Sequence, residues 1–113
     1  MSSVNIMRNI NDATYAEILQ NASKLVLVLF TTDYSGISQL MLPIVETASR
    51  DYADTYDCYR ARCEESREMV AKFGIRVVPT LAVFSGNRLT SVRINSMNDA
   101  QVRSFLTSSM AAT

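Results

Sequence analysis

Continuous apolar stretches alternate with amphipathic stretches along this chain, and the pattern predicts strands alternating with helices. Residues 24–31 form an apolar run without alternation, which is typical of a strand covered by helices on both faces. From Ser38 to Tyr52 the apolar residues recur at helical spacing, and Pro43 is expected to kink this helix. Further strands are expected at 4–8, 56–62, 77–84 and 89–94.

Three shorter helical patterns complete the order of elements. Asn11 is expected to cap the first, which runs to about residue 22. The acidic residues 64–65 suit the start of the next helix, and Gly74 its end. Ser96 or Asn98 is expected to cap the last. The order β-α-β-α-β-α-β-β-α predicts an α/β protein with a mixed sheet of about five strands and about four flanking helices, in a single domain over residues 1–113.

Composition and charge narrow the classes of function. Eleven basic and eleven acidic residues balance, so we expect neither a nucleic acid nor a membrane as partner. The chain has no histidine, which excludes a histidine base and a Ser-His or Cys-His nucleophile pair. Two cysteines make a poor zinc site, and no phosphate-binding glycine pattern appears, so we expect no metal and no cofactor. Residues 1–5 show no secretory signal, and the expected location is the cytoplasm.

Residues 34–38, Tyr-Ser-Gly-Ile-Ser, lie between the central apolar run and the helical pattern that follows it. About forty residues later, Val78-Pro79-Thr80 opens another apolar run. This spacing resembles the thioredoxin family, whose W-C-G-P-C motif sits between a central strand and a helix, with a cis-proline facing it. Further matching residues are Phe30, Pro43, 72–76, Leu81 and Phe84. The resemblance implies a thioredoxin fold and a cis Val78-Pro79 bond that faces Ser35.

In the family, the first motif cysteine attacks a substrate disulfide and the second resolves the mixed disulfide. By position, Ser35 and Ser38 replace these two sulfur atoms, so the resemblance implies a degenerate motif without catalytic residues. The family's motif tryptophan is Tyr34 here, and its buried acid is Leu29. Laboratory replacement of both cysteines is another possible origin of the serines, but it does not explain Leu29. Helix capping is the simpler role for both hydroxyls.

The function expected from this resemblance is binding without redox chemistry. In the family, the backbone before the cis-proline pairs with an extended peptide, a contact that needs no sulfur. We expect a protein partner or unfolded polypeptide in a chaperone-like or adaptor role, and Met41 is expected to adapt to varied partners. The expected lining residues are Tyr34, Ser35, Gly36, Ile37, Val78 and Pro79. A structural subunit of a larger complex is a further interpretation.

Cys58 and Cys63 allow an alternative, a thiol-disulfide oxidoreductase or a redox-responsive protein. Five residues of extended strand span about 16 Å, whereas a disulfide needs Cα atoms within about 7 Å. The two cysteines therefore pair only if the strand breaks between them. Cys58 is expected to be a small buried apolar residue. Cys63 is expected to be more exposed, with Arg60 and Arg62 lowering its pKa and the acidic residues 64–65 opposing them.

Overall fold

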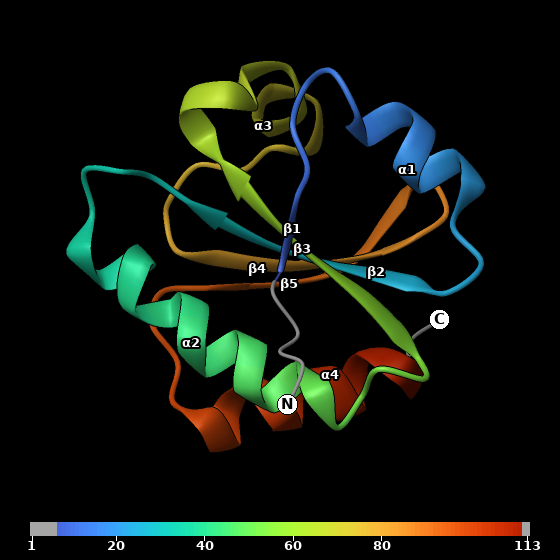
Figure 1. Ribbon diagram of the computed structural model, residues 1–113, viewed down its shortest axis with the longest axis vertical. Coiled ribbons are helices and arrows are strands. Elements are labelled where there is room, and N and C mark those ends of the chain that lie inside the picture. Colours follow the sequence, from blue (N-terminus) through green and yellow to red (C-terminus); the bar gives the residue numbers. More distant parts are fainter. Residues whose placement is uncertain (1–6, 112–113) are drawn as a thin grey trace.

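The computed structural model describes residues 7–111 and places a five-stranded sheet between two layers of helices (Figure 1). The elements are β1 (Arg8–Asn9), α1 (Tyr15–Asn21), β2 (Leu25–Thr31), α2 (Gly36–Arg50), β3 (Tyr56–Arg62), a 3-10 turn (Cys63–Glu65), α3 (Arg67–Phe73), β4 (Thr80–Ser85), β5 (Arg88–Ile94) and α4 (Asp99–Ala111). The strand order is β1-β3-β2-β4-β5, parallel from β1 to β2 and antiparallel from β2 to β5. The predicted α/β architecture with a mixed sheet is confirmed.

Strand β2 lies at the centre of the sheet, and both of its faces are covered. Val28 and Phe30 pack into the apolar cluster beneath α1 and α3. Leu27 and Leu29 pack into the cluster on the opposite face, beneath α2 and α4. The predicted strand without alternation is therefore confirmed, and its cause is burial on two sides.

Two predicted helix ends are also confirmed. Gly74 ends α3 in the left-handed conformation at φ 71°, a region that favours glycine. Asn98 caps the start of α4, because its side-chain Oδ1 accepts a hydrogen bond from the N–H of Gln101 at 2.8 Å. The side chain of Gln101 accepts in return from the N–H of Asn98 at 2.9 Å, which completes a capping box.

Two helix starts differ from the prediction. Asn11 is not the cap of α1, since its carbonyl accepts from Thr14 and Tyr15 in a preceding turn and the helix begins at Tyr15. The acidic pair at 64–65 lies in the 3-10 turn, one residue before the cap of α3 at Ser66. In both places the chain makes an extra turn before the helix.

Two strands differ from the prediction in their bounds within the described residues. β4 begins at Thr80, because residues 77–79 form a bend in front of it. β1 contains Arg8 and Asn9, and the predicted residues 4–6 lie outside the described part of the chain.

Pro43 lies inside α2, which continues on both sides of it. Within residues 7–111, no helix has the length and apolar character needed to cross a membrane.

Candidate functional site

Antiparallel pairing brings two distant loops to one end of the sheet. Phe30 of β2 pairs with Thr80 of β4, so the loop after β2 and the bend before β4 lie at the same end of the sheet. The Val78–Pro79 peptide bond in that bend is cis. The N–H of Asn95 donates to the carbonyl of Pro79 at 2.9 Å, which brings the end of β5 to the same place. The predicted site residues on both loops therefore share one end of the fold.

Ser35 and Ser38 hold the start of α2 through their hydroxyl groups. Ser35 is the N-cap, and its Oγ accepts from the N–H of Ser38 at 3.2 Å. Ser38 is fully buried, and its Oγ accepts from the N–H of Thr32 at 3.1 Å. The same hydroxyl lies within donating distance of the carbonyls of Thr32 (3.1 Å) and Ser35 (3.0 Å). Both serine side chains are thus occupied by bonds that shape the loop.

Apolar side chains project from the motif into solvent. Tyr34 is 91% exposed and Ile37 is 56% exposed. Leu40, one helical turn further along α2, is 68% exposed, although its spacing had suggested the core. A shallow hollow beside them is lined by Ile37, Leu40, Met41, Ile44, Ser96 and Met97. This surface could not be assigned from periodicity alone, because Leu40 fits a helical apolar stripe in either case.

Met41 lies beneath this surface. It was expected to contact varied partners, but its side chain is buried in the core. The residue is 1% exposed and belongs to the core beneath α2 and α4. Its sulfur accepts a hydrogen bond from the N–H of Met97 at 3.3 Å. Met41 therefore joins α2 to the segment before α4 and forms the floor of the hollow.

The backbone of Val78 is available for pairing. Its side chain packs on the core beneath α1 and α3, and the residue is half-buried. Neither its N–H nor its carbonyl makes a hydrogen bond within residues 7–111. An extended peptide is one ligand that satisfies both groups of such a residue.

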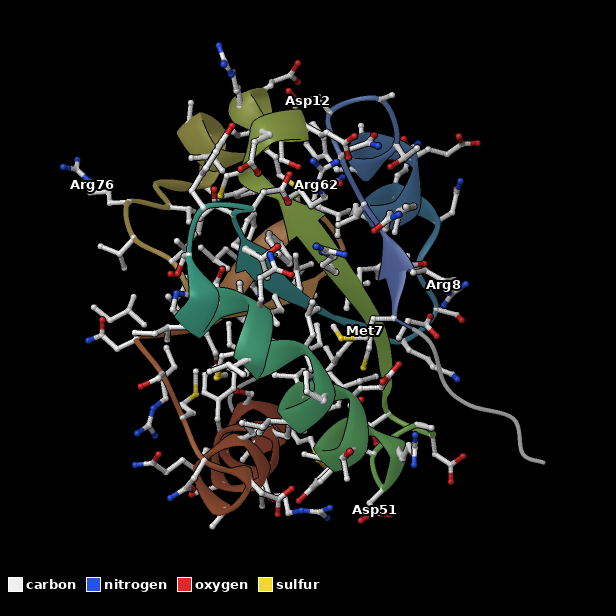
Figure 2. The ribbon with its side chains drawn as sticks, turned by 60° about the vertical axis from the view of Figure 1, so that its left-hand side comes forward. Met7, Arg8, Asp12, Asp51, Arg62 and Arg76 are labelled. Atoms are coloured by element: carbon white, nitrogen blue, oxygen red, sulfur yellow. The ribbon has the colours of Figure 1, made fainter. Side chains whose placement is uncertain are left out.

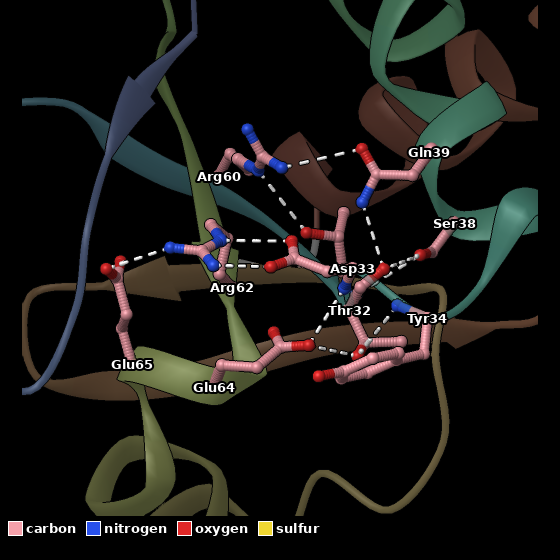
Figure 3. Close-up of polar contacts among 10 residues, drawn as sticks. Thr32, Asp33, Tyr34, Ser38, Gln39, Arg60, Arg62, Glu64 and Glu65 are labelled. Carbon is pink, nitrogen blue, oxygen red and sulfur yellow. Dashed lines mark hydrogen bonds and ion pairs between the residues drawn. The ribbon is translucent and has the colours of Figure 1, made fainter.

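Glu64 fixes the loop that carries Tyr34 (Figure 3). Its Oε2 accepts from the hydroxyl of Thr32 and from the N–H of Asp33, the latter at 2.9 Å. These bonds, with the Thr32 hydroxyl first, lower the pKa of the Glu64 carboxyl. The 3-10 turn after β3 therefore clamps the loop after β2.

Arg62 adds a second clamp from the end of β3. Its guanidinium donates to both carboxylate oxygens of Asp33 and also contacts Glu65 at 2.8 Å (Figure 3). The hydrogen bond from Arg62 is the main cause that lowers the pKa of Asp33. A carboxylate held in this way is a poor base for a serine hydroxyl.

Arg60 lies on the same strand and is also bonded. Its Nε donates to the hydroxyl of Thr31 at 3.3 Å, and a terminal nitrogen lies 3.5 Å from Oε1 of Gln39. Gln39 in turn donates from Nε2 to the carbonyl of Thr32 at 2.9 Å (Figure 3). Both arginines at this end of β3 are thus used within the fold.

The two cysteines lie on opposite faces of the sheet. Cys58 packs against the cluster beneath α2 and α4, and Cys63 against the cluster beneath α1 and α3. Both are free, and burial is the main cause that raises the pKa of each thiol. Glu64 raises the pKa of Cys63 further, so of the two opposing charge effects expected from the sequence, the acidic one acts on this thiol. The structure does not bring either thiol to a partner sulfur.

Asn95 was missed by the sequence reasoning. It is a non-glycine residue with φ 73°, in a region where asparagine is among the better tolerated residues. The one signal for it was an asparagine directly after a predicted strand.

Within residues 7–111, no group of three or more His, Cys, Asp or Glu residues is placed to hold a metal ion.

These observations define a class of protein: an α/β fold in which a helix start follows the central strand and shares one end of the sheet with a cis-proline bend. Comparison with known proteins agrees. The family model for thioredoxin matches residues 6–111. The chain therefore belongs to the thioredoxin family.

Several relatives are themselves thioredoxins. The chain is 32% identical over 91 residues to the chloroplastic M-type thioredoxin of Pisum sativum. The aligned region covers 80% of this chain and 53% of that protein. It is 27% identical over 101 residues to thioredoxin of Acidithiobacillus ferridurans, and 24% over 98 residues to that of Pseudomonas aeruginosa. These matches cover 89% and 87% of this chain, and 94% and 91% of the relatives. The chain spans about half the length of the pea relative.

Proposed function

We propose that this protein binds an extended segment of a partner or unfolded polypeptide and exchanges no disulfides at its motif. We assign the proposed binding groove to Tyr34, Ser35, Gly36, Ile37, Val78 and Pro79. The observation that carries the proposal is the state of the two motif serines. The Ser35 hydroxyl caps α2, and the Ser38 hydroxyl binds the half-buried backbone of Thr32 in the preceding loop. An oxygen at each of these positions cannot form the disulfide that dithiol exchange requires.

The groove retains what peptide binding needs. Val78 offers an unpaired backbone N–H and carbonyl within the described chain. Tyr34 and Ile37 offer apolar surface whose burial stabilises a complex by roughly 25 cal/mol per Å² before ordering costs. The bonds of Glu64 and Arg62 hold the loop in place, which lowers the ordering cost on binding.

A thiol oxidoreductase acting through Cys63 or Cys58 is the second candidate, and the relatives named thioredoxin favour it. The thiol environments argue against it. Burial raises the pKa of both thiols, which reduces the reactive thiolate fraction near neutral pH. We expect both to react with a disulfide reagent more slowly at pH 7 in the folded chain than in urea. Fast labelling of Cys63 in the folded state would favour the oxidoreductase.

Binding is tested with a polypeptide that cannot fold, reduced and carboxymethylated α-lactalbumin carrying a fluorescent label. We expect the wild-type chain to raise the anisotropy of this probe. The double variant Tyr34→Ala/Ile37→Asp removes apolar surface and places a charge in the groove. It is expected to weaken binding at least about tenfold, because central aromatic contacts dominate such interfaces.

The matched control is Ala16→Asp, which adds the same charge at an exposed position of α1, away from the groove. This variant is expected to bind like the wild type. Equal binding by all three proteins would show that the groove is not the binding surface and would contradict the proposal.

A further inference from the structure

The charges of this neutral chain are unevenly placed. Residues 69–98 contain Lys72, Arg76, Arg88 and Arg93 but no aspartate or glutamate. This segment includes β4 and β5, the antiparallel side of the sheet. Strands β4 and β5 and the segments that flank them within residues 69–98 therefore carry basic residues and no acidic ones.

The side chains of the β5 arginines have no partner within residues 7–111. Their backbone pairs with β4, but neither guanidinium makes a hydrogen bond or an ion pair there. The side chain of Arg76, directly before the bend at 77–79, is also unpaired and extends away from the body of the molecule (Figure 2). By contrast, Arg8 and Arg103 each contact a carboxylate, Arg8 at 3.5 Å from Asp57. Unpaired cations on one side are available to an external anion.

Strand β5 has one charged face and one apolar face. Arg93 lies opposite Leu81, whose side chain faces α2 and α4. Val92 lies opposite Ala82, which faces α1 and α3. Directly opposed residues of an antiparallel pair share a face of the sheet. By the same register, Arg88 and Ser91 share the face of Arg93, and Leu89 and Ile94 share the face of Val92.

The outer edge of β5 is open. This strand is last in the sheet order and pairs with β4 alone among the described strands. Because the N–H of Asn95 bonds to the carbonyl of Pro79, alternation directs the backbone groups of Val92 and Ile94 away from β4. The side chains of Val92 and Ile94 are 44% and 50% exposed. An added strand would thus find free donors, free acceptors and apolar contacts.

We propose that the edge of β5 binds an extended acidic segment of another protein as an additional strand. The segment alternates acidic and apolar residues, because acidic side chains then lie beside Arg88 and Arg93 and apolar ones beside Val92 and Ile94. A second copy of this chain is a poorer occupant, since it brings the same arginines and no acid on this strand. The surface is separate from the groove at Tyr34 and does not depend on its function.

The probe is a fluorescein-labelled decapeptide of alternating glutamate and valine, with a lysine–valine decapeptide as its counterpart. We expect anisotropy to show binding of the acidic peptide alone. Arg88→Glu/Arg93→Glu is expected to weaken binding about tenfold or more, since it replaces two attractions by repulsions. Arg50→Glu/Arg67→Glu makes the same change in net charge at exposed positions on α2 and α3 and is expected to change affinity less than twofold.

Hydrogen exchange tests the backbone pairing in the unmodified protein. Saturating acidic peptide is expected to slow exchange of the Val92 and Ile94 amides, which point outward. The Ser91 and Arg93 amides face β4 and serve as internal references. Binding without this protection, or equal loss of affinity in both charge variants, would overturn the proposal in favour of a general polyanion site. An oligonucleotide bound as tightly, or protection of both amides by self-association without peptide, would also overturn it.

Discussion

Arginines at the end of β3 and arginines on β5 show opposite uses of the same side chain. Arg60 and Arg62 are bonded to Thr31, Gln39, Asp33 and Glu65. The side chains of Arg88 and Arg93 make no hydrogen bond or ion pair within residues 7–111. The first pair shapes the loop that presents Tyr34, whereas the second leaves its charge available to a partner. The folding role of one region and the binding role of the other can therefore be separated by mutation.

The largest effect is expected at Ser38, which belongs to the bonded region. Ser38→Ala removes a fully buried hydroxyl that accepts from the N–H of the half-buried Thr32, and should destabilise the fold by about 1–3 kcal/mol. Ser91→Ala, on the β5 side, makes the same chemical change and is expected to stay within about 0.5 kcal/mol of the wild type. Urea unfolding of both variants measures the difference. Equal midpoints would mean that the loop does not depend on this hydroxyl.

A pH dependence of intermediate size is expected from the same region. The pKa values of Asp33 and Glu64 are lowered in the fold, so their stabilising contribution is present above the unfolded-state values near 4 and is lost as pH falls through the lower folded values. The free energy of unfolding should be steady from pH 7 to 5 and fall below about pH 4. Glu64→Gln should flatten this decline. If the free energy of unfolding of Glu64→Gln falls with pH as it does in the wild type, Glu64 does not contribute to this pH dependence.

The smallest effect is expected from the β5 arginines. Arg93→Gln should leave the free energy of unfolding within about 0.5 kcal/mol of the wild type, because no bond within the described chain is lost. It should also leave the pH profile unchanged. Arg62→Gln, which breaks the contact with Asp33, should shift both. Equal free energies of unfolding for the two variants in urea would show that the arginine on β3 stabilises the fold no more than the arginine on β5.

The fold could be predicted because its signals are local and repeated. The apolar run of β2, the glycine that ends α3 and the asparagine that begins α4 each fix one element. Element starts were less accurate. Asn11 and the acidic pair at 64–65 belong to turns that precede helices, and turn residues resemble caps in sequence.

The candidate site was predictable only in part. Family spacing pointed to Ser35, Ser38 and Pro79, which the structure brings to one end of the sheet. The Glu64–Asp33 contact and the exposure of Leu40 depend on tertiary placement, so no local pattern carries them.

The most direct test of the central claim is the dithiothreitol-driven reduction of insulin, measured for the wild-type chain and for Cys58→Ser/Cys63→Ser, with an active thioredoxin as positive control. Because residues 35 and 38 are serines, whose oxygen atoms form no disulfide, we expect both proteins to leave the rate at the level of dithiothreitol alone. A rate above that level in the wild type, lost in Cys63→Ser or Cys58→Ser, would contradict the account and identify a thiol oxidoreductase. A rate above that level in the cysteine-free variant would contradict it outright.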